Sequence, residues 1–196
     1  MLNAGTDRFE VSKLPQTGNY LVKIADKDRE FDLIHKLNYR IFVEEIPQHE
    51  RNDNRKLIDH FHLENTYLIA LDGEYLAGMI AVRGNRPFSL DFKISDLDSY
   101  LPVGRKVCEI RLLAIEKEYR GGKIFFLLMK QLVEYGIEVG YDYAVISGTT
   151  RQQKLYQHLG FQPFHPRVGK KGAYFIPMGA ALEDFERRLG KLQEKG

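Results

Sequence analysis

A turn rich in glycine and positive charge stands near the middle of the 196-residue chain. It follows an apolar strand pattern that ends at Ile115 and precedes a helical pattern that runs on from Ile124. The turn consists of Arg120, Gly121, Gly122 and Lys123. Backbone amides at a helix N-terminus carry partial positive charge, and glycines let a phosphate approach them. The turn is therefore a candidate pyrophosphate site, although a plain glycine turn with solvated basic residues would have the same sequence.

The strand before this turn carries two charges in an otherwise apolar run. Side chains alternate between the two faces of a strand. One face is therefore expected to hold Glu109, Arg111, Leu113 and Ile115, and the other Ile110, Leu112 and Ala114. Arg111 could bind a substrate carboxylate through two parallel hydrogen bonds, or it could simply neutralise Glu109 two residues away. The sequence leaves both interpretations open.

The surrounding pattern predicts the elements that position these residues. Asp72-Gly73-Glu74 separates two apolar runs, at 66–71 and 75–82, which predicts an antiparallel hairpin. Further strands are expected at 20–25, 107–115, 143–146 and 173–178, and helices at 27–42, 122–139, about 150–159 and about 180–194. Together they predict an α/β fold with a mixed sheet and helices on its faces. We expect a single domain over 1–196, with its core at about 20–178.

Composition argues against several classes of protein. Lys plus Arg number 29 against 27 for Asp plus Glu, so the net charge of +2 would attract neither nucleic acid nor an anionic membrane. Cys108 is the only cysteine, and its apolar setting predicts a buried strand residue in a reducing cytoplasm. No apolar run approaches the length of a membrane span, and the N-terminus lacks a signal-peptide pattern. We therefore expect a cytoplasmic protein with no membrane span and no nucleic-acid partner.

Other kinds of catalytic site have little support. The six histidines are dispersed, and Asp59 with His60 and His62 forms the only local cluster, so no metal site is predicted. The chain has no Gly-x-Ser-x-Gly motif, and its one cysteine has no evident relay partner, which argues against covalent catalysis. The glycine turn also lacks the Lys-Ser or Lys-Thr of a P-loop.

Two segments resemble motifs A and B of the GNAT acyltransferase superfamily. The family's glycine signature has Gln or Arg, then Gly three residues later, then Gly or Ala two residues after that. At these positions the chain has Glu118, Gly121 and Lys123. Lys123 departs from the pattern, so Gly122 would take over the close contact with pyrophosphate. The 155–161 segment matches the family's Leu-Tyr-x-x-Leu-Gly-Phe ending more faithfully, and the resemblance covers about 21–178.

The resemblance implies a mostly antiparallel, twisted sheet in which the strands at 107–115 and 144–147 splay apart around an acyl thioester. The donor would contact the backbone of Leu113, Ala114 and Ile115 and the turn formed by Arg120, Gly121, Gly122, Lys123 and Ile124. An amine would attack the thioester directly, with a backbone amide near Leu113 as hydrogen-bond donor to the oxyanion. Tyr156 would protonate the leaving thiolate and Glu109 would accept the amine proton, directly or through water. Tyr156 could equally be a packing residue, and Glu109 an ion-pair partner of Arg111.

Within the superfamily, Tyr39 to Glu45 and Glu109 to Leu112 look similar to autoinducer synthases and long-chain N-acyl amino acid synthases. That branch implies transfer from acyl-CoA, or from an acyl carrier protein, to a small-molecule amine or amino-acid acceptor, with no metal. Phe125 and Phe126 could line an acyl tunnel, or they could be ordinary helix core. A homodimer is compatible with this interpretation.

Two alternatives stay open. A non-catalytic GNAT-fold module that binds an acyl thioester without turnover would tolerate Lys123 in the glycine signature. A peptide or protein acetyltransferase would use acetyl-CoA and would need an open acidic groove. Glu44, Glu45 and Glu50 could supply the charge of such a groove, but they could equally be solvated surface.

Overall fold

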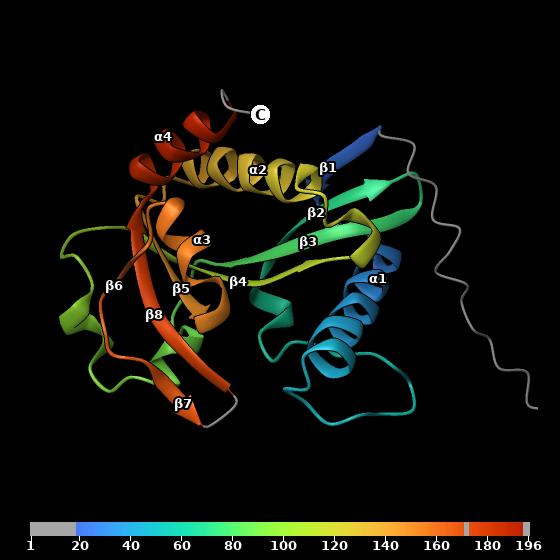
Figure 1. Ribbon diagram of the computed structural model, residues 1–196, viewed down its shortest axis with the longest axis horizontal. Helices are drawn as coiled ribbons and strands as arrows, with labels where there is room; N and C mark the ends of the chain where they lie inside the picture. The colour runs from blue at the N-terminus through green and yellow to red at the C-terminus, as the bar shows by residue number, and fades with distance from the viewer. Residues whose placement is uncertain (1–18, 171–172, 194–196) are drawn as a thin grey trace, which may run out of the picture.

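The hairpin around Gly73 forms part of an eight-stranded sheet. The computed structural model describes residues 19–170 and 173–193, whose elements are labelled in Figure 1. The strands are β1 (Tyr20–Ile24), β2 (Thr66–Asp72), β3 (Tyr75–Arg83), β4 (Val107–Ile115), β5 (Tyr143–Thr149), β6 (Gln162–Pro163), β7 (Val168–Lys170) and β8 (Ala173–Ala181). They pair in the order β1-β2-β3-β4-β5-β8-β6, with β7 also on β8. Only β4 and β5 pair in parallel among these strands, which confirms the mixed, mostly antiparallel sheet.

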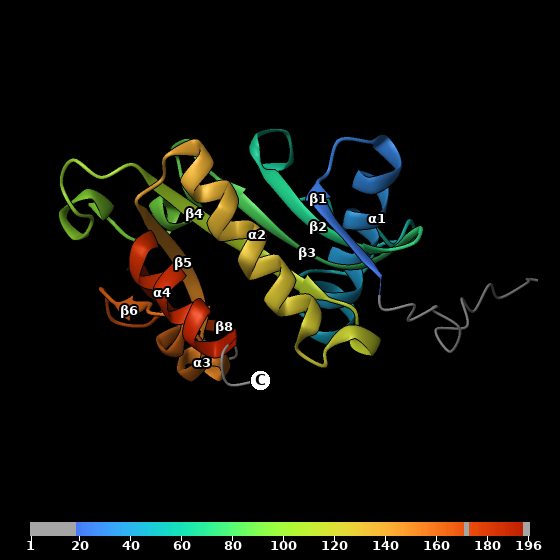
Figure 2. The same ribbon diagram turned by 90° about the horizontal axis from the view of Figure 1, so that it is seen from above.

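Helices cover both faces of this sheet, as predicted. The α-helices are α1 (Asp28–Tyr39), α2 (Lys123–Val139), α3 (Gln153–His158) and α4 (Leu182–Gln193), and α1 continues into a π-helix, η2 (Arg40–Glu45). Short 3₁₀ turns are η3 (His62–Glu64), η4 (Ser89–Phe92), η5 (Leu97–Tyr100), η6 (Lys117–Tyr119) and η7 (Thr150–Gln152). Figures 1 and 2 show α2 and α4 over one face and α1 on the other.

Hydrophobic clusters hold these layers together. On the α2 face, Leu128 and Leu132 belong to a buried cluster that includes Ile80 and Ile146. On the opposite face, α1 buries residues against β2 and β3, and a third cluster packs η4 and its neighbours against β5. The α1 cluster includes Ile34, Leu37, Ile69 and Met79, and the third includes Phe88, Leu90, Ile94 and Val145. Each face of the sheet is therefore covered by apolar side chains, which fixes the position of η4 as well as those of α1 and α2.

The parallel pair β4–β5 is short. Its register runs from Val107 opposite Tyr143 to Ile110 opposite Ile146. Beyond these residues β4 continues against β3, and β5 continues against β8. The two central strands therefore splay apart, as the resemblance implied.

A β-bulge interrupts β4 at the same level. Leu112 has a φ of 54°, in the left-handed region that bulky residues rarely adopt. The register against β3 shifts between Met79 and Ala81, so β4 holds one residue more than its partner here.

The bulge reverses the facing of the second half of β4. Cys108 and Ile110 belong to the α2-face core, whereas after the bulge it is Leu113 and Ile115 that pack against it. The residues that face α1 are Leu112 and Ala114. The prediction that Glu109 and Arg111 share a face with Leu113 and Ile115 was therefore wrong, because strict alternation allows no extra residue.

Several element boundaries differ from the prediction. β5 runs on to Thr149 rather than 146, β6 and β7 were not predicted, and the helix expected at about 150–159 is divided into η7 and α3. β8 extends to Ala181 rather than 178, because Ala180 and Ala181 continue the ladder opposite Ala144 and Tyr143, and the helix predicted from about 180 begins at Leu182. The end of that predicted helix, 194, lies outside the described residues. The first predicted helix, 27–42, is divided into α1 and the π-helix η2.

Candidate active site

The predicted donor contacts lie along the part of β4 that has left β5. Two of them, Ala114 and Ile115, pair with β3, and Leu113 lies next to the β4 bulge. Within the described sheet, no strand pairs with the other edge of this part of β4. Free backbone groups on a strand edge can bind an extended ligand through ladder-type hydrogen bonds. Leu113 and Ile115 are partly buried against the α2-face core, and Ala114 is buried. An extended pantetheine arm would thus find an open strand edge beside the α2 face.

The glycine turn leads from this edge into α2. Gly122 is the N-cap of the helix with a φ of 96°, and its carbonyl accepts the first helical hydrogen bond from the Phe126 amide at 2.9 Å. A methyl group added to Gly121 or Gly122 would meet no atom within 4 Å. Protein atoms therefore leave room beside the two glycines that precede the free helix amides, which suits an anion.

The basic residues of the turn have other contacts. Arg120 pairs with Glu45 of η2 at 2.7 Å, and its Nε donates to the Ile115 carbonyl at 3.0 Å. The Lys123 ammonium lies 4.9 Å from the centre of the Tyr20 ring. Ile124 is buried in the α2-face core, so its amide alone could contact a phosphate. Backbone groups rather than these side chains therefore make up the candidate phosphate cradle.

Tyr156 lies beside the splayed part of β5. Its ring carbons would approach a methyl group on Gly148 to 3.0 Å, and its hydroxyl donates to Gln152 at 2.9 Å. Gly148 follows Ile146 by two residues, so Tyr156 lies on the α2 side of the sheet. Burial raises the pKa of the Tyr156 phenol. A phenol that stays protonated beside the splayed part of β5 could donate a proton.

Glu109 is fully buried on the opposite face. One of its oxygens accepts from the Ser89 amide at 2.7 Å and the other from the Ser89 hydroxyl at 2.6 Å. The Arg111 Nε lies 3.5 Å from the carboxylate. This geometry favours an anchoring role that joins η4 to β4 over the role of a base.

Arg111 has a stronger partner that the sequence did not indicate. Its guanidinium forms two hydrogen bonds with Asp59, at 2.9 and 3.0 Å, and both side chains are almost buried. Arg111 and Arg83 lie on the Phe61 ring, with their guanidinium carbons 4.7 and 4.0 Å from its centre. Asp59 and Arg111 are 52 positions apart in the sequence, which explains why spacing could not reveal the pair. The sequence suggested Asp59 only as part of a weak metal cluster.

A lysine completes this face of the splayed strands. The Lys93 ammonium lies 3.4 Å from the Ser147 hydroxyl and 4.5 Å from the centre of the Phe175 ring. Ser147 is the first residue of β5 beyond the pairing with β4. Lys93 directly follows η4, a segment in which the sequence shows no recognisable catalytic motif. Sequence analysis therefore did not identify Lys93 as a candidate site residue. The splay thus has Tyr156 on one side and Lys93 with Arg111 on the other.

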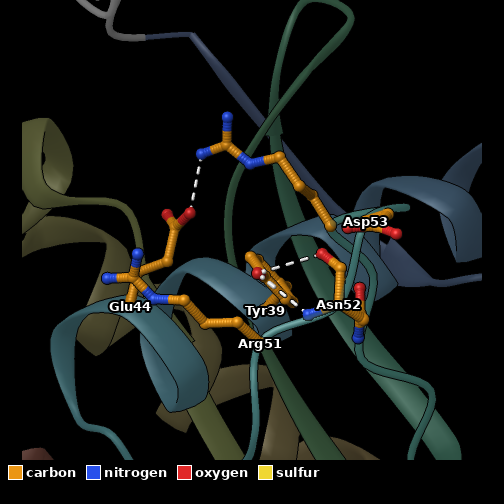
Figure 3. Close-up of a pocket in the computed structure, with 6 residues that line it drawn as sticks. Tyr39, Glu44, Arg51, Asn52 and Asp53 are labelled. Atoms are coloured by element: carbon orange, nitrogen blue, oxygen red, sulfur yellow. Dashed lines mark hydrogen bonds and ion pairs between the residues drawn. The ribbon is translucent and has the colours of Figure 1, made fainter.

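A polar surface pocket lies elsewhere, at η2. Its volume is ≈ 490 Å³, and it is lined by Tyr39, Glu44, Arg51, Asn52, Asp53 and Arg55. Figure 3 shows the Tyr39 hydroxyl hydrogen-bonded to the backbone of Asn52, and Glu44, which pairs with Arg55 at 2.6 Å. None of the lining residues belongs to β4, β5 or the glycine turn. This pocket therefore shares no lining residue with the site at the splayed strands.

Three further features bear on function. Cys108 is buried as predicted, and burial raises its pKa to about 12, so the thiol is unreactive. Within 19–170 and 173–193, no group of three or more His, Cys, Asp or Glu side chains could hold a metal ion. Over the same residues, every helix falls short of the length and apolar character that a membrane span requires.

Several solved structures share this fold. The CoA-dependent acyl-homoserine lactone synthase BjaI has a TM-score of 0.72 at 15% identity, covering 89% of this chain and 90% of that one. The acyl-homoserine lactone synthase LasI has a TM-score of 0.70 at 18% identity, covering 87% and 94%. FeeM, an N-acyl amino acid synthase from uncultured soil microbes, has a TM-score of 0.66 at 18% identity, also covering 87% and 94%.

Sequence comparison adds a curated relative and a family. An uncharacterized N-acetyltransferase from Dictyostelium discoideum is 36% identical over 64 residues, which span 31% of this chain and 30% of that protein. A sequence model of the N-acyl amino acid synthase FeeM family matches residues 34–176, most of the chain. The predicted resemblance to the GNAT superfamily and its acyl amino acid synthase branch is confirmed. The chain is an acyltransferase and belongs to the FeeM N-acyl amino acid synthase family.

Proposed function

We propose that this protein transfers an acyl group from a pantetheine thioester to the amino group of a free amino acid. The observation that carries the proposal is the separation of β4 from β5 beyond Ile110 and Ile146. On the α2 side, this separation exposes an edge of β4 next to the glycine turn. On the other side of the sheet, the charged residues Arg111, Asp59 and Lys93 lie next to the separated strands. A donor and an acceptor could therefore approach the same point from opposite faces of the sheet. Membership in the family supports an amino acid as the acceptor.

The donor side is built mainly from backbone groups. Gly121 and Gly122 leave the start of α2 open for the pyrophosphate of coenzyme A, and the free edge of β4 suits the pantetheine arm. An acyl carrier protein presents the same pantetheine thioester without the nucleotide, so this geometry accommodates either donor. Phe125 and Phe126 are partly buried against the α2-face core and are the nearest aromatic side chains of α2 to the turn.

The chemical step needs one proton donor at sulfur. The neutral amine nitrogen forms a bond to the thioester carbonyl carbon, and the carbon–sulfur bond breaks with its electrons on sulfur. Tyr156 protonates the thiolate, and the new amide nitrogen loses its proton through water, which restores the phenol. A backbone amide near Leu113 would donate to the oxyanion. We assign no proton transfer to Glu109, because Ser89 already holds both of its oxygens.

A module that binds thioesters without turnover is the second candidate. The feature that supports it is Lys123, which stands where the superfamily has Gly or Ala and whose ammonium lies 4.9 Å from the centre of the Tyr20 ring. Such a module would bind coenzyme A but release no thiol.

Acyl transfer can be tested directly. We would incubate the purified protein with octanoyl-CoA, hexadecanoyl-CoA or the same chains on acyl carrier protein, together with each amino acid. Free thiol would be followed along with product mass. We expect thiol release that depends on the amino acid, with the mass of an N-acyl amino acid. The absence of release with every donor, while calorimetry still detects coenzyme A binding, would favour the binding module.

A further inference from the structure

Lys93 has a defined place at the point where β4 and β5 separate. Val145 belongs to the cluster formed with η4, and Ser147, two residues further along β5, faces the same way. The Lys93 ammonium lies 3.4 Å from the Ser147 hydroxyl and above the Phe175 ring at 4.5 Å. It therefore lies on the face opposite α2, on the acceptor side of the proposed reaction.

The backbone around Lys93 is held firmly. Its amide donates to the Leu90 carbonyl at 3.0 Å, and the neighbouring Leu90 and Ile94 side chains are buried against β5. The same turn, η4, supplies Ser89 to the Glu109 carboxylate on β4. η4 and the residue that follows it thus contact both central strands, at Glu109 near the end of the β4–β5 pairing and at Ser147, the first residue of β5 beyond it. The fold therefore fixes the backbone from which the Lys93 side chain extends toward Ser147.

The charges around this site leave one cation without a carboxylate. Arg111 pairs with Asp59 and Glu109, and Arg83 pairs with Glu64. No Asp or Glu of the described residues forms an ion pair with Lys93. Burial lowers the pKa of the Lys93 ammonium, Glu109 raises it and Arg111 lowers it further. The Lys93 side chain is exposed, so an incoming anion can reach the ammonium and accept a charge-assisted hydrogen bond from it.

We propose that Lys93 binds the carboxylate of the amino-acid acceptor and so makes the enzyme prefer amino acids to plain amines. This inference rests on the proposed function. A carboxylate over the ammonium would leave the α-amino group free to point into the splay, toward a thioester held along β4. Phe92 is 68% exposed beside Lys93 and offers apolar surface to the acceptor side chain, and its ring lies 6.2 Å from that of the buried Phe61.

The test compares acceptors that differ only in the carboxylate. The pairs are L-phenylalanine with 2-phenylethylamine and L-leucine with 3-methylbutylamine. In Lys93→Met we expect KM for the amino acids to rise about 10- to 100-fold, the range that a charge-assisted hydrogen bond contributes. KM for the amines and kcat for all four acceptors should change little. Lys93→Arg should restore most of the amino-acid preference, because it keeps the charge.

Lys106→Met is the matched control. The Lys106 ammonium also lies over an aromatic ring, 5.2 Å from Tyr141, and donates to the Val139 carbonyl at 2.7 Å, but it precedes the opposite end of β4. This variant should keep all four KM values, and thermal unfolding should show that both variants are folded.

The outcomes separate the two proposals. An equal loss for amines and amino acids in a folded Lys93→Met protein, or no change at all, would overturn the carboxylate role and leave the acyltransfer proposal intact. A wild-type protein that acylates the amines as well as the amino acids would also overturn it. Failure of the wild type with every acceptor would overturn the proposed function and the acceptor site together.

Discussion

Tyr156 is the residue whose chemistry can be separated most cleanly from its packing. Burial raises the pKa of its phenol, so the hydroxyl stays protonated at neutral pH and is suited to act as an acid. Tyr156→Phe keeps the ring against Gly148 and removes only the hydroxyl. We expect kcat to fall about 100-fold, as is usual for loss of a general acid, with little change in donor KM. Steady-state thiol release with the preferred donor would measure this.

Tyr143→Phe is the control for that change. Burial also raises the pKa of Tyr143, but its ring lies next to Gly179 and its residue pairs with Val107 at the closed end of β4–β5. Removal of the Tyr143 hydroxyl should leave kcat at the wild-type value. A Tyr156→Phe protein with normal kcat and a lower melting temperature would show that Tyr156 is only a packing residue.

His35 predicts how stability depends on pH. The His35 side chain is buried, and its ring centre lies 4.5 Å from that of His62. Burial, and then the neighbouring His62, lower the pKa of His35. Asp32 raises this pKa and Lys56 lowers it. The unfolded chain therefore takes up a proton on His35 near its ordinary value of 6.5, whereas the native protein does so only at lower pH. Stability should fall as the pH drops below about 6.5.

Urea unfolding between pH 7.5 and 5 would measure this slope in the wild type and in His35→Phe. The phenylalanine variant should lose less stability over that interval, because one group that titrates differently in the two states is gone. Equal slopes in the two proteins would mean that His35 does not contribute.

At the scale of elements, the glycine turn offers two neighbouring positions with different conformational demands. Gly122 has a φ of 96°, so Gly122→Ala should cost about 1–3 kcal/mol of stability. Gly121 does not have a positive φ, and a methyl group there would meet no protein atom, so Gly121→Ala should fold normally. If the turn cradles pyrophosphate, the same methyl group occupies the ligand's space. We expect Gly121→Ala to weaken coenzyme A binding at least tenfold in calorimetry without changing the melting temperature.

Gly190→Ala is the matched substitution in α4. A methyl group at Gly190 also meets no atom, and α4 carries none of the predicted donor contacts. It should leave coenzyme A affinity unchanged. Equal affinity in Gly121→Ala would instead favour the plain glycine turn that the sequence also allowed.

The elements predicted from local signals were largely correct. Gly73 between two apolar runs identified the β2–β3 hairpin, and the apolar periodicity after Gly122 identified α2. The bulge at Leu112 was missed because leucine has no preference for a positive φ, so only the opposing strand reveals the extra residue. The contacts made by Asp59 and Lys93 were missed because they join residues more than 50 positions apart.

At the scale of the whole molecule, one core connects the two halves of the sheet, which are β1 to β4 on one side of the β4–β5 junction and β5 to β8 on the other. The direct ladder between these halves is short, from Val107 with Tyr143 to Ile110 with Ile146. The α2-face cluster adds side chains from both sides of that junction. It includes Leu68 and Ile80 from one half, Ala144 and Met178 from the other, and Leu128, Met129 and Leu132 from α2. The side chains of α2 therefore join the two halves in addition to the strand pairing.

The single-domain prediction can be tested through this core. If α2 joins both halves, calorimetry should record one unfolding transition with equal calorimetric and van't Hoff enthalpies. Leu132 is 2% exposed within the shared cluster, so Leu132→Ala should cost about 2–5 kcal/mol and move that single transition as a whole. Two independent halves would instead give two transitions, of which the substitution would move mainly one. Since donor and acceptor would bind on opposite faces of the same splay, a single transition would also mean that coenzyme A, by stabilising one face, stabilises the face that receives the acceptor.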